Sequence, residues 1–180
     1  MKKYLWVGIF VLSMTLHSFG WAVGPATLYE LYEGKSVKVF IEEIKDSSPQ
    51  HKLNPPDVKR KLAEALGNRK SIRFQVVEVS AEADVSIGVD LKDFYWTDHD
   101  PIDMLMGIGG AAADAAIRED YVKVEADFLV KELKKNSVLW KDRVIATITK
   151  KPMSEAESIP LVAEDLAKVF IRECFGKKRK

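Results

Sequence analysis

The sequence has few residues of the kinds that form covalent cross-links or common active sites. It contains one cysteine, Cys174, and three histidines in 180 residues. A single cysteine cannot form a disulfide within the chain, so the fold must be stabilised by its hydrophobic core. Cys174 follows Leu166 and Phe170 on an apolar stripe of helical spacing, which predicts a buried thiol. An intermolecular disulfide is the alternative.

The sequence also lacks an excess of charge of either sign, because it has 28 basic and 27 acidic residues. General nucleic-acid binding depends on a net basic face, so this balance argues against a nucleic-acid partner. Serine, histidine and aspartate occur without the arrangement of a nucleophile set. The glycines at 107, 109 and 110 lack the lysine that follows a phosphate-binding loop. We therefore expect no catalytic residue, no resident metal and no cofactor.

The long apolar run of this chain lies at its N-terminus. Basic residues at Lys2 and Lys3 precede an apolar stretch over residues 4–16, and small residues follow at Gly20 and Ala22. This order is typical of a secretory signal peptide cleaved after Ala22. The run is shorter than the roughly 20 residues of a spanning helix, which argues against a retained membrane anchor. We expect a protein that is periplasmic or secreted and able to associate with the outer membrane, without a transmembrane helix after cleavage.

Loss of the signal would leave 26 basic and 27 acidic residues in a chain long enough for one domain. We predict a signal peptide at 1–22, a loose leader at 23–34, a single domain at 35–176 and a basic tail at 177–180. Such a tail is usually solvated, although basic residues also suit contact with anionic lipid.

Hydrophobic periodicity predicts both strands and helices in the domain. Alternating apolar residues predict strands near 37–41, 71–79, 85–96, 121–131 and 138–149. In the third of these the apolar parity changes after Leu91, which predicts a bulge near Lys92 and Asp93. Apolar faces of helical spacing predict helices at 55–67 and from Glu157 or Ser158 to 175, with Pro160 in the first turn of the second.

The order strand, helix, four strands, helix predicts an α/β (α+β) fold with two layers. The first strand, helix and second strand should form a right-handed crossover with a parallel pair. The last two strands should form an antiparallel hairpin around the polar turn at 134–137, with Val138 and Trp140 on one face. We therefore predict a mixed sheet of about five strands with both helices on one face.

Several segments resemble a family of small proteins of the bacterial envelope. They are KSVKVFIEEIKD at 35–46, FQVVEVSAEADVSIGVDLKDF at 74–94, SVLWKDRV at 137–144 and LVAEDLAKVFI at 161–171. This succession resembles the lipopolysaccharide-assembly lipoprotein of the outer-membrane translocon and the amino-terminal domain of the Tol–Pal propeller protein. The resemblance implies a two-layer fold and an envelope location. Members of this family usually carry an acylated N-terminal cysteine, which this sequence lacks.

The segment at 97–118 has the composition of an interaction element. It places glycine and alanine beside apolar residues, and small residues let a backbone approach a neighbouring surface closely. Together with the aromatic residues before it, the segment would form an exposed apolar patch, which marks an interaction site. A buried lid over an open sheet edge is the alternative. The candidate partner-binding residues are Phe94, Tyr95, Trp96, Met104, Leu105, Met106 and Ile108.

Asp98, His99, Asp100 and Asp103 form the polar cluster with ligand character. Carboxylate and imidazole groups suit a divalent cation. Adjacent side chains on an extended segment diverge, however, and Pro101 marks a turn in which such residues are ordinary. The sequence therefore predicts a non-enzymatic envelope protein that binds a protein or lipid partner, in outer-membrane assembly or maintenance. The alternatives are a metal-binding module or metal-dependent enzyme, and an oligomeric structural scaffold.

Overall fold

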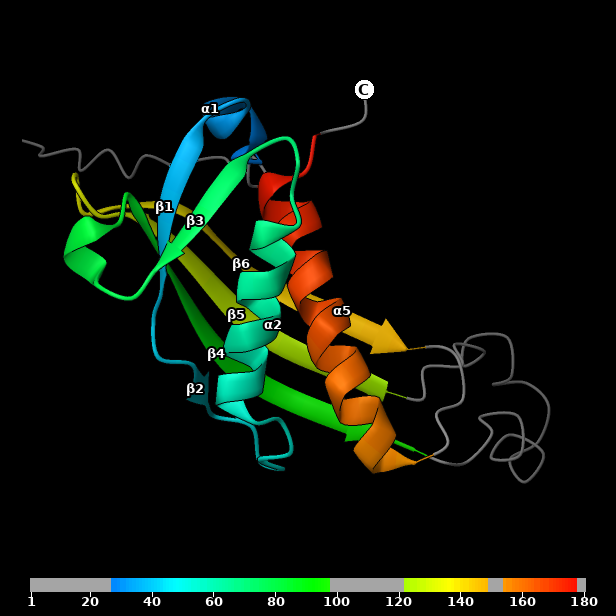
Figure 1. Cartoon of the computed structure of the whole chain (residues 1–180). Helices are drawn as coiled ribbons and strands as arrows, with labels where there is room; N and C mark the ends of the chain where they lie inside the picture. Colours follow the sequence, from blue (N-terminus) through cyan, green and yellow to red (C-terminus); the bar gives the residue numbers. More distant parts are fainter. Residues whose placement is uncertain (1–26, 98–121, 149–153, 178–180) are drawn as a thin grey trace, which may run out of the picture.

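A computed structural model describes residues 27–97, 122–148 and 154–177. Two helices lie side by side across one face of a single sheet (Figure 1). This arrangement confirms the predicted two-layer α+β sandwich. The elements in chain order are α1 (Tyr29–Tyr32), β1 (Ser36–Ile41), β2 (Lys45–Asp46), α2 (Pro55–Gly67), β3 (Arg73–Val77), the 3₁₀ turn η1 (Ser80–Glu82), β4 (Val85–Trp96), β5 (Val122–Glu132), β6 (Ser137–Ile148) and α5 (Glu155–Phe175).

The sheet is mixed, with the strand order β3-β1-β4-β5-β6. β1 pairs in parallel with both β3 and β4. The parallel pairing of β1 with β3 is the one predicted from the crossover through α2. β4, β5 and β6 form an antiparallel meander, so the predicted hairpin of the last two strands is confirmed. The short β2 was not predicted; its two residues continue the pairing of β1 along β4.

A bulge in β4 decides which side chains enter the core. Leu91 pairs with Ala126 but Asp93 pairs with Glu125, so Lys92 is an extra residue in β4. The predicted bulge is therefore confirmed. Because an extra residue reverses the alternation of a strand, Leu91 and Phe94 both face the helices, and Phe94 is only 3% exposed.

A second bulge, in β6, was not predicted. Val130 pairs with Trp140 while the next residue, Lys131, pairs with Val138, so Leu139 is the extra residue. The expectation that Val138 and Trp140 share a face was therefore wrong. Trp140 is buried, whereas Val138 is 59% exposed on the face that the helices leave open.

The helix α5 begins earlier than its hydrophobic stripe suggested. Its N-cap is Ser154, whose side chain accepts a hydrogen bond of 3.2 Å from the backbone N–H of Glu157. The start predicted at Glu157 or Ser158 was therefore late, and Pro160 lies beyond the first turn. A polar cap, rather than an apolar residue, positions the beginning of this helix.

The core lies between the sheet and the two helices, and aromatic rings form its centre. Phe170 of α5 stacks on Phe128 of β5, with 4.3 Å between ring centroids and 13° between ring planes. Trp140 and Phe175 contact the Phe170 ring by their edges. Cys174 is fully buried, as predicted, and burial raises the pKa of its thiol, which disfavours the reactive thiolate.

Part of the predicted leader is ordered. Leu28 and Tyr29 are buried, and the backbone N–H of Leu28 donates to the carbonyl of Cys174 at 2.7 Å. The turn α1 therefore packs against the end of α5, and the chain enters the domain beside the point where α5 stops.

Candidate functional site

The three described candidate residues lie at the end of β4, and they differ in exposure. Phe94 belongs to the core. Tyr95 is 48% exposed on the open face of the sheet, opposite Lys123 of β5. Trp96 is half-buried and pairs with Val122. Of the three aromatic residues only Tyr95 is exposed, because the bulge at Lys92 turns Phe94 inward and Trp96 lies on the same side of the strand as Phe94.

The other candidates, Met104, Leu105, Met106 and Ile108, lie outside the described residues. The same holds for the metal-ligand candidates Asp98, His99, Asp100 and Asp103. Within residues 27–97, 122–148 and 154–177, no group of three or more His, Cys, Asp or Glu side chains is placed to hold a metal ion.

Trp96 carries a polar group with an unusual environment. Its indole Nε1 is buried and has no hydrogen-bond partner among the residues that the structure describes. A buried donor without an acceptor costs about 1–3 kcal/mol. Trp140 has the same feature, but its ring lies inside the core against Phe170. Trp96, in contrast, lies at the end of β4, where its ring packs against the edge of the core on the face opposite the exposed Tyr95.

The open face of the sheet beside this site carries a row of alternating charges. Arg143 of β6 donates from Nε to Asp127 of β5 at 2.8 Å and lies 3.6 Å from Glu125. Lys92, the bulged residue, contacts both Asp127 and Asp90. The hydrogen bond from Arg143 lowers the pKa of Asp127. These residues occupy outward-facing positions of β4, β5 and β6. The period-two pattern of each strand predicts that they face outward, but it does not predict which of them pair across strands.

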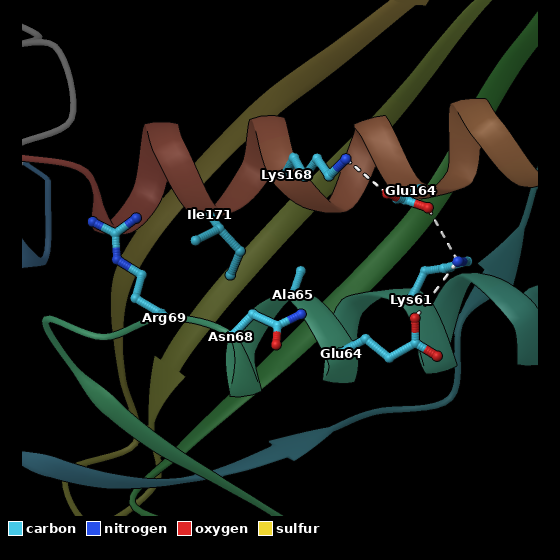
Figure 2. A pocket seen from close by; sticks show the side chains of 8 residues that line it. All are labelled: Lys61, Glu64, Ala65, Asn68, Arg69, Glu164, Lys168 and Ile171. Carbon is cyan, nitrogen blue, oxygen red and sulfur yellow. Dashed lines mark hydrogen bonds and ion pairs between the residues drawn. The ribbon is translucent and has the colours of Figure 1, made fainter.

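A shallow groove of about 290 Å³ runs between α2 and α5 (Figure 2). Glu164 of α5 accepts a hydrogen bond from Lys61 of α2 at 3.2 Å and pairs with Lys168 at 2.7 Å. At the far end of the groove, Arg69 donates from Nη2 to the carbonyl of Phe175 at 2.7 Å. The Lys61–Glu164 pair joins α2 to α5, and the bond from Arg69 joins the end of α2 to the end of α5. The sequence did not reveal this groove, because the two helices are about a hundred residues apart in the chain.

Comparison with known proteins finds similarity in folded structure alone. No family model and no curated protein matches the sequence. A PelC dodecamer from Paraburkholderia phytofirmans is 15% identical, with a TM-score of 0.48 over 75% of this chain and 86% of that chain. The LpoB C-terminal domain from Salmonella enterica is 8% identical, with a TM-score of 0.41 over 67% and 89%. Lipoprotein GNA1162 from Neisseria meningitidis is 9% identical, with a TM-score of 0.33 over 71% and 91%.

These structures are similar to the chain at the level of its coarse architecture, and bacterial lipoproteins are among them. Similarity of fold at such low identity does not assign a function. The functional argument therefore depends on the residues of this chain.

The carboxylates of the open face and of the groove are held in ion pairs, and the thiol of Cys174 is enclosed. None of the described helices is long and apolar enough to cross a membrane. What stands out is an exposed tyrosine beside a tryptophan whose N–H has no acceptor within the described part of the chain, at the end of a long strand.

Proposed function

We propose that this protein is a non-enzymatic component of the bacterial envelope that binds a protein or lipid partner through the end of β4. The contact surface consists of Tyr95 and Trp96, with Met104, Leu105, Met106 and Ile108 from the segment that follows. The proposed role is in assembly or maintenance of the outer membrane. The signal-like N-terminus supports export, which places the protein where such a partner is met.

The observation that carries the proposal is the environment of the Trp96 indole. Tyrosine and tryptophan are enriched at protein interfaces because each combines a large apolar surface with a polar group. The indole N–H of Trp96 is shielded from solvent and finds no acceptor in the described ranges, and its neighbour Tyr95 is half exposed. A partner that supplies an acceptor at the end of β4 would satisfy this N–H, while the Tyr95 ring offers apolar surface on the opposite, open face of the same strand.

Site-specific photo-cross-linking in intact cells tests this proposal. A cross-linking amino acid at position 95 should capture an envelope component, and the same probe at position 161 should not. Leu161 is a suitable control because its side chain is 54% exposed but lies on α5. Deletion of residues 101–117 should abolish the product at position 95. Equal products at both positions, or a product that survives the deletion, would contradict the proposed surface.

A Trp96→Phe variant tests the indole itself. It keeps an aromatic ring and removes the N–H, so the free protein should lose little stability. Cross-linking from position 95 should nevertheless fall, because the partner's acceptor is then left unpaired. A variant that is destabilised while cross-linking stays unchanged would show that the N–H serves the fold.

A further inference from the structure

One end of the molecule brings together basic side chains from segments far apart in the sequence. The end of α5, the loop after α2, the start of β3 and the turn α1 all lie there (Figure 1). Arg69 donates to the carbonyl of Phe175, and the backbone N–H of Arg73 donates to the carbonyl of Lys35 at 3.0 Å. The amine of Lys177 lies 5.9 Å from the ring centroid of Tyr29. We refer to this region as the basic end.

Basic residues outnumber acidic ones at the basic end. Among the described residues, six basic side chains stand there against three acidic ones. Two further carboxylates near Tyr32 of α1, Asp84 and Glu132, are paired with Lys134 and Lys135. The basic residues are Lys35, Arg69, Lys70, Arg73, Arg172 and Lys177, and the acidic ones are Glu30, Glu33 and Glu173.

The cations of the basic end are also less neutralised than those elsewhere. Among its described basic residues, only Arg172 has an ion pair, with Glu173 at 3.8 Å. Lys45, Lys52 and Lys168, in contrast, each pair with a carboxylate. The basic end therefore presents positive charge that the carboxylates of the described ranges do not compensate.

An exposed apolar side chain accompanies these charges. Leu31 of α1 is 46% exposed, and its carbonyl accepts a hydrogen bond from the amine of Lys35 at 2.7 Å. A cluster of basic residues with an apolar side chain among them fits the surface of an anionic bilayer. We propose that the basic end docks this protein onto a membrane surface that contains anionic phospholipid.

The proposed partner surface then faces away from the lipid. β4 runs parallel to β1, which starts beside α1, so Trp96 lies at the opposite end of the sheet. Twelve residues of strand span about 40 Å. Docking by the basic end therefore leaves Tyr95 and Trp96 free to meet a partner, and it does not require the function proposed above.

Vesicle co-sedimentation of the exported protein tests the proposal. One variant replaces four residues of the basic end: Lys70→Gln, Arg73→Gln, Arg172→Gln and Lys177→Gln. Arg69 is kept because it bonds to the end of α5. A control variant has the same net charge but alters cations elsewhere: Lys45→Gln, Lys52→Gln, Lys141→Gln and Lys168→Gln.

The wild type and the control should bind vesicles that contain phosphatidylglycerol, and bind vesicles of phosphatidylcholine alone much less. The basic-end variant should bind the anionic vesicles about tenfold more weakly or worse, since each basic residue near such a surface contributes. Added salt should weaken binding of the wild type. Leu31→Gln should weaken binding without changing this salt dependence.

Equal loss in both quadruple variants would show a general charge effect and overturn the proposal. Equal binding to both kinds of vesicle would do the same. Retention on heparin without any binding to anionic vesicles would assign the basic end to a soluble polyanion instead. Thermal melts of both variants establish that their folds are intact. If the vesicle experiment overturns lipid docking, the cross-linking test of the partner surface at position 95 still stands by itself.

Discussion

Phe170 joins the helical layer to the sheet, and its removal should be the most damaging single change among those considered. The side chain is 0% exposed, stacks on Phe128 and receives edge contacts from Trp140 and Phe175. Truncation of a buried Phe to Ala typically costs about 3–5 kcal/mol, because the transfer free energy of the ring is lost and a cavity remains. A domain of this size is stable by about 5–15 kcal/mol, so Phe170→Ala should remove a large share.

Phe170→Leu separates volume from ring geometry. It keeps most of the apolar volume and loses the three aromatic contacts, so we expect a cost of about 1.5 kcal/mol. In a double-mutant cycle with Phe128→Leu, the stacked pair should show a coupling of about 0.5–1.5 kcal/mol. The control is Leu161→Ala on the same helix, which is half exposed and should change stability by less than about 0.5 kcal/mol.

Urea denaturation of the exported protein, followed by circular dichroism, measures these values. The midpoint should fall in the order control, Phe170→Leu, Phe170→Ala, with little change in the slope. The reasoning is refuted if Phe170→Ala costs less than about 1 kcal/mol, or if the Leu and Ala variants are equally destabilised. Either result would mean that the rings do not form the contact between the layers.

Two further predictions concern a helix cap and an ion pair. Ser154→Ala should destabilise the protein by about 1 kcal/mol in urea denaturation, because the N–H of Glu157 loses its acceptor. Ser154→Asp should retain most of the stability, since its carboxylate can accept the same bond. Equal losses in both variants would argue against capping. The hydrogen bond from Arg143 lowers the pKa of Asp127 in the folded state. The stabilisation by this pair should be complete above the unfolded pKa of about 3.9 and be lost as the pH falls through the folded pKa. Stability measured between about pH 6 and pH 2 should therefore fall less steeply in Asp127→Asn than in the wild type, and identical slopes would contradict the assignment.

The two ends of the molecule have different chemistry. The basic end combines weakly compensated cations with Leu31. The far end of β4 carries Tyr95 on the open face and, on the opposite face, the Trp96 indole, which lacks an acceptor in the described part of the chain. These surfaces are separated by the length of the sheet. The two proposals together imply that the protein holds a lipid surface and a partner at the same time, and the two proposed experiments test the two contacts independently.

Local sequence patterns predicted most of the fold. Period-two alternation located the five long strands, and Asn54, Pro55 and Gly67 bounded the first long helix within a residue. The parity change after Leu91 even located the bulge in β4, because an extra residue leaves a visible break in the alternation. The bulge at Leu139 left no such break, since Val138, Leu139 and Trp140 are all apolar.

Contacts between distant segments were beyond the reach of the sequence. The burial of Phe94, the charge row through Arg143 and Asp127, and the groove between α2 and α5 depend on which strands and helices become neighbours.

The basic end shows this dependence most clearly. Lys35 and Arg73 are ordinary as isolated positions, and they become neighbours because the crossover through α2 pairs the start of β3 with the start of β1, at the end of the molecule where α5 also ends (Figure 1). The sequence by itself determined most of the elements and the near balance of total charge, and it predicts the compartment, because these follow from composition and from short-range periodicity. Only the tertiary structure decided where that charge and the aromatic side chains are exposed, because exposure is set by long-range packing.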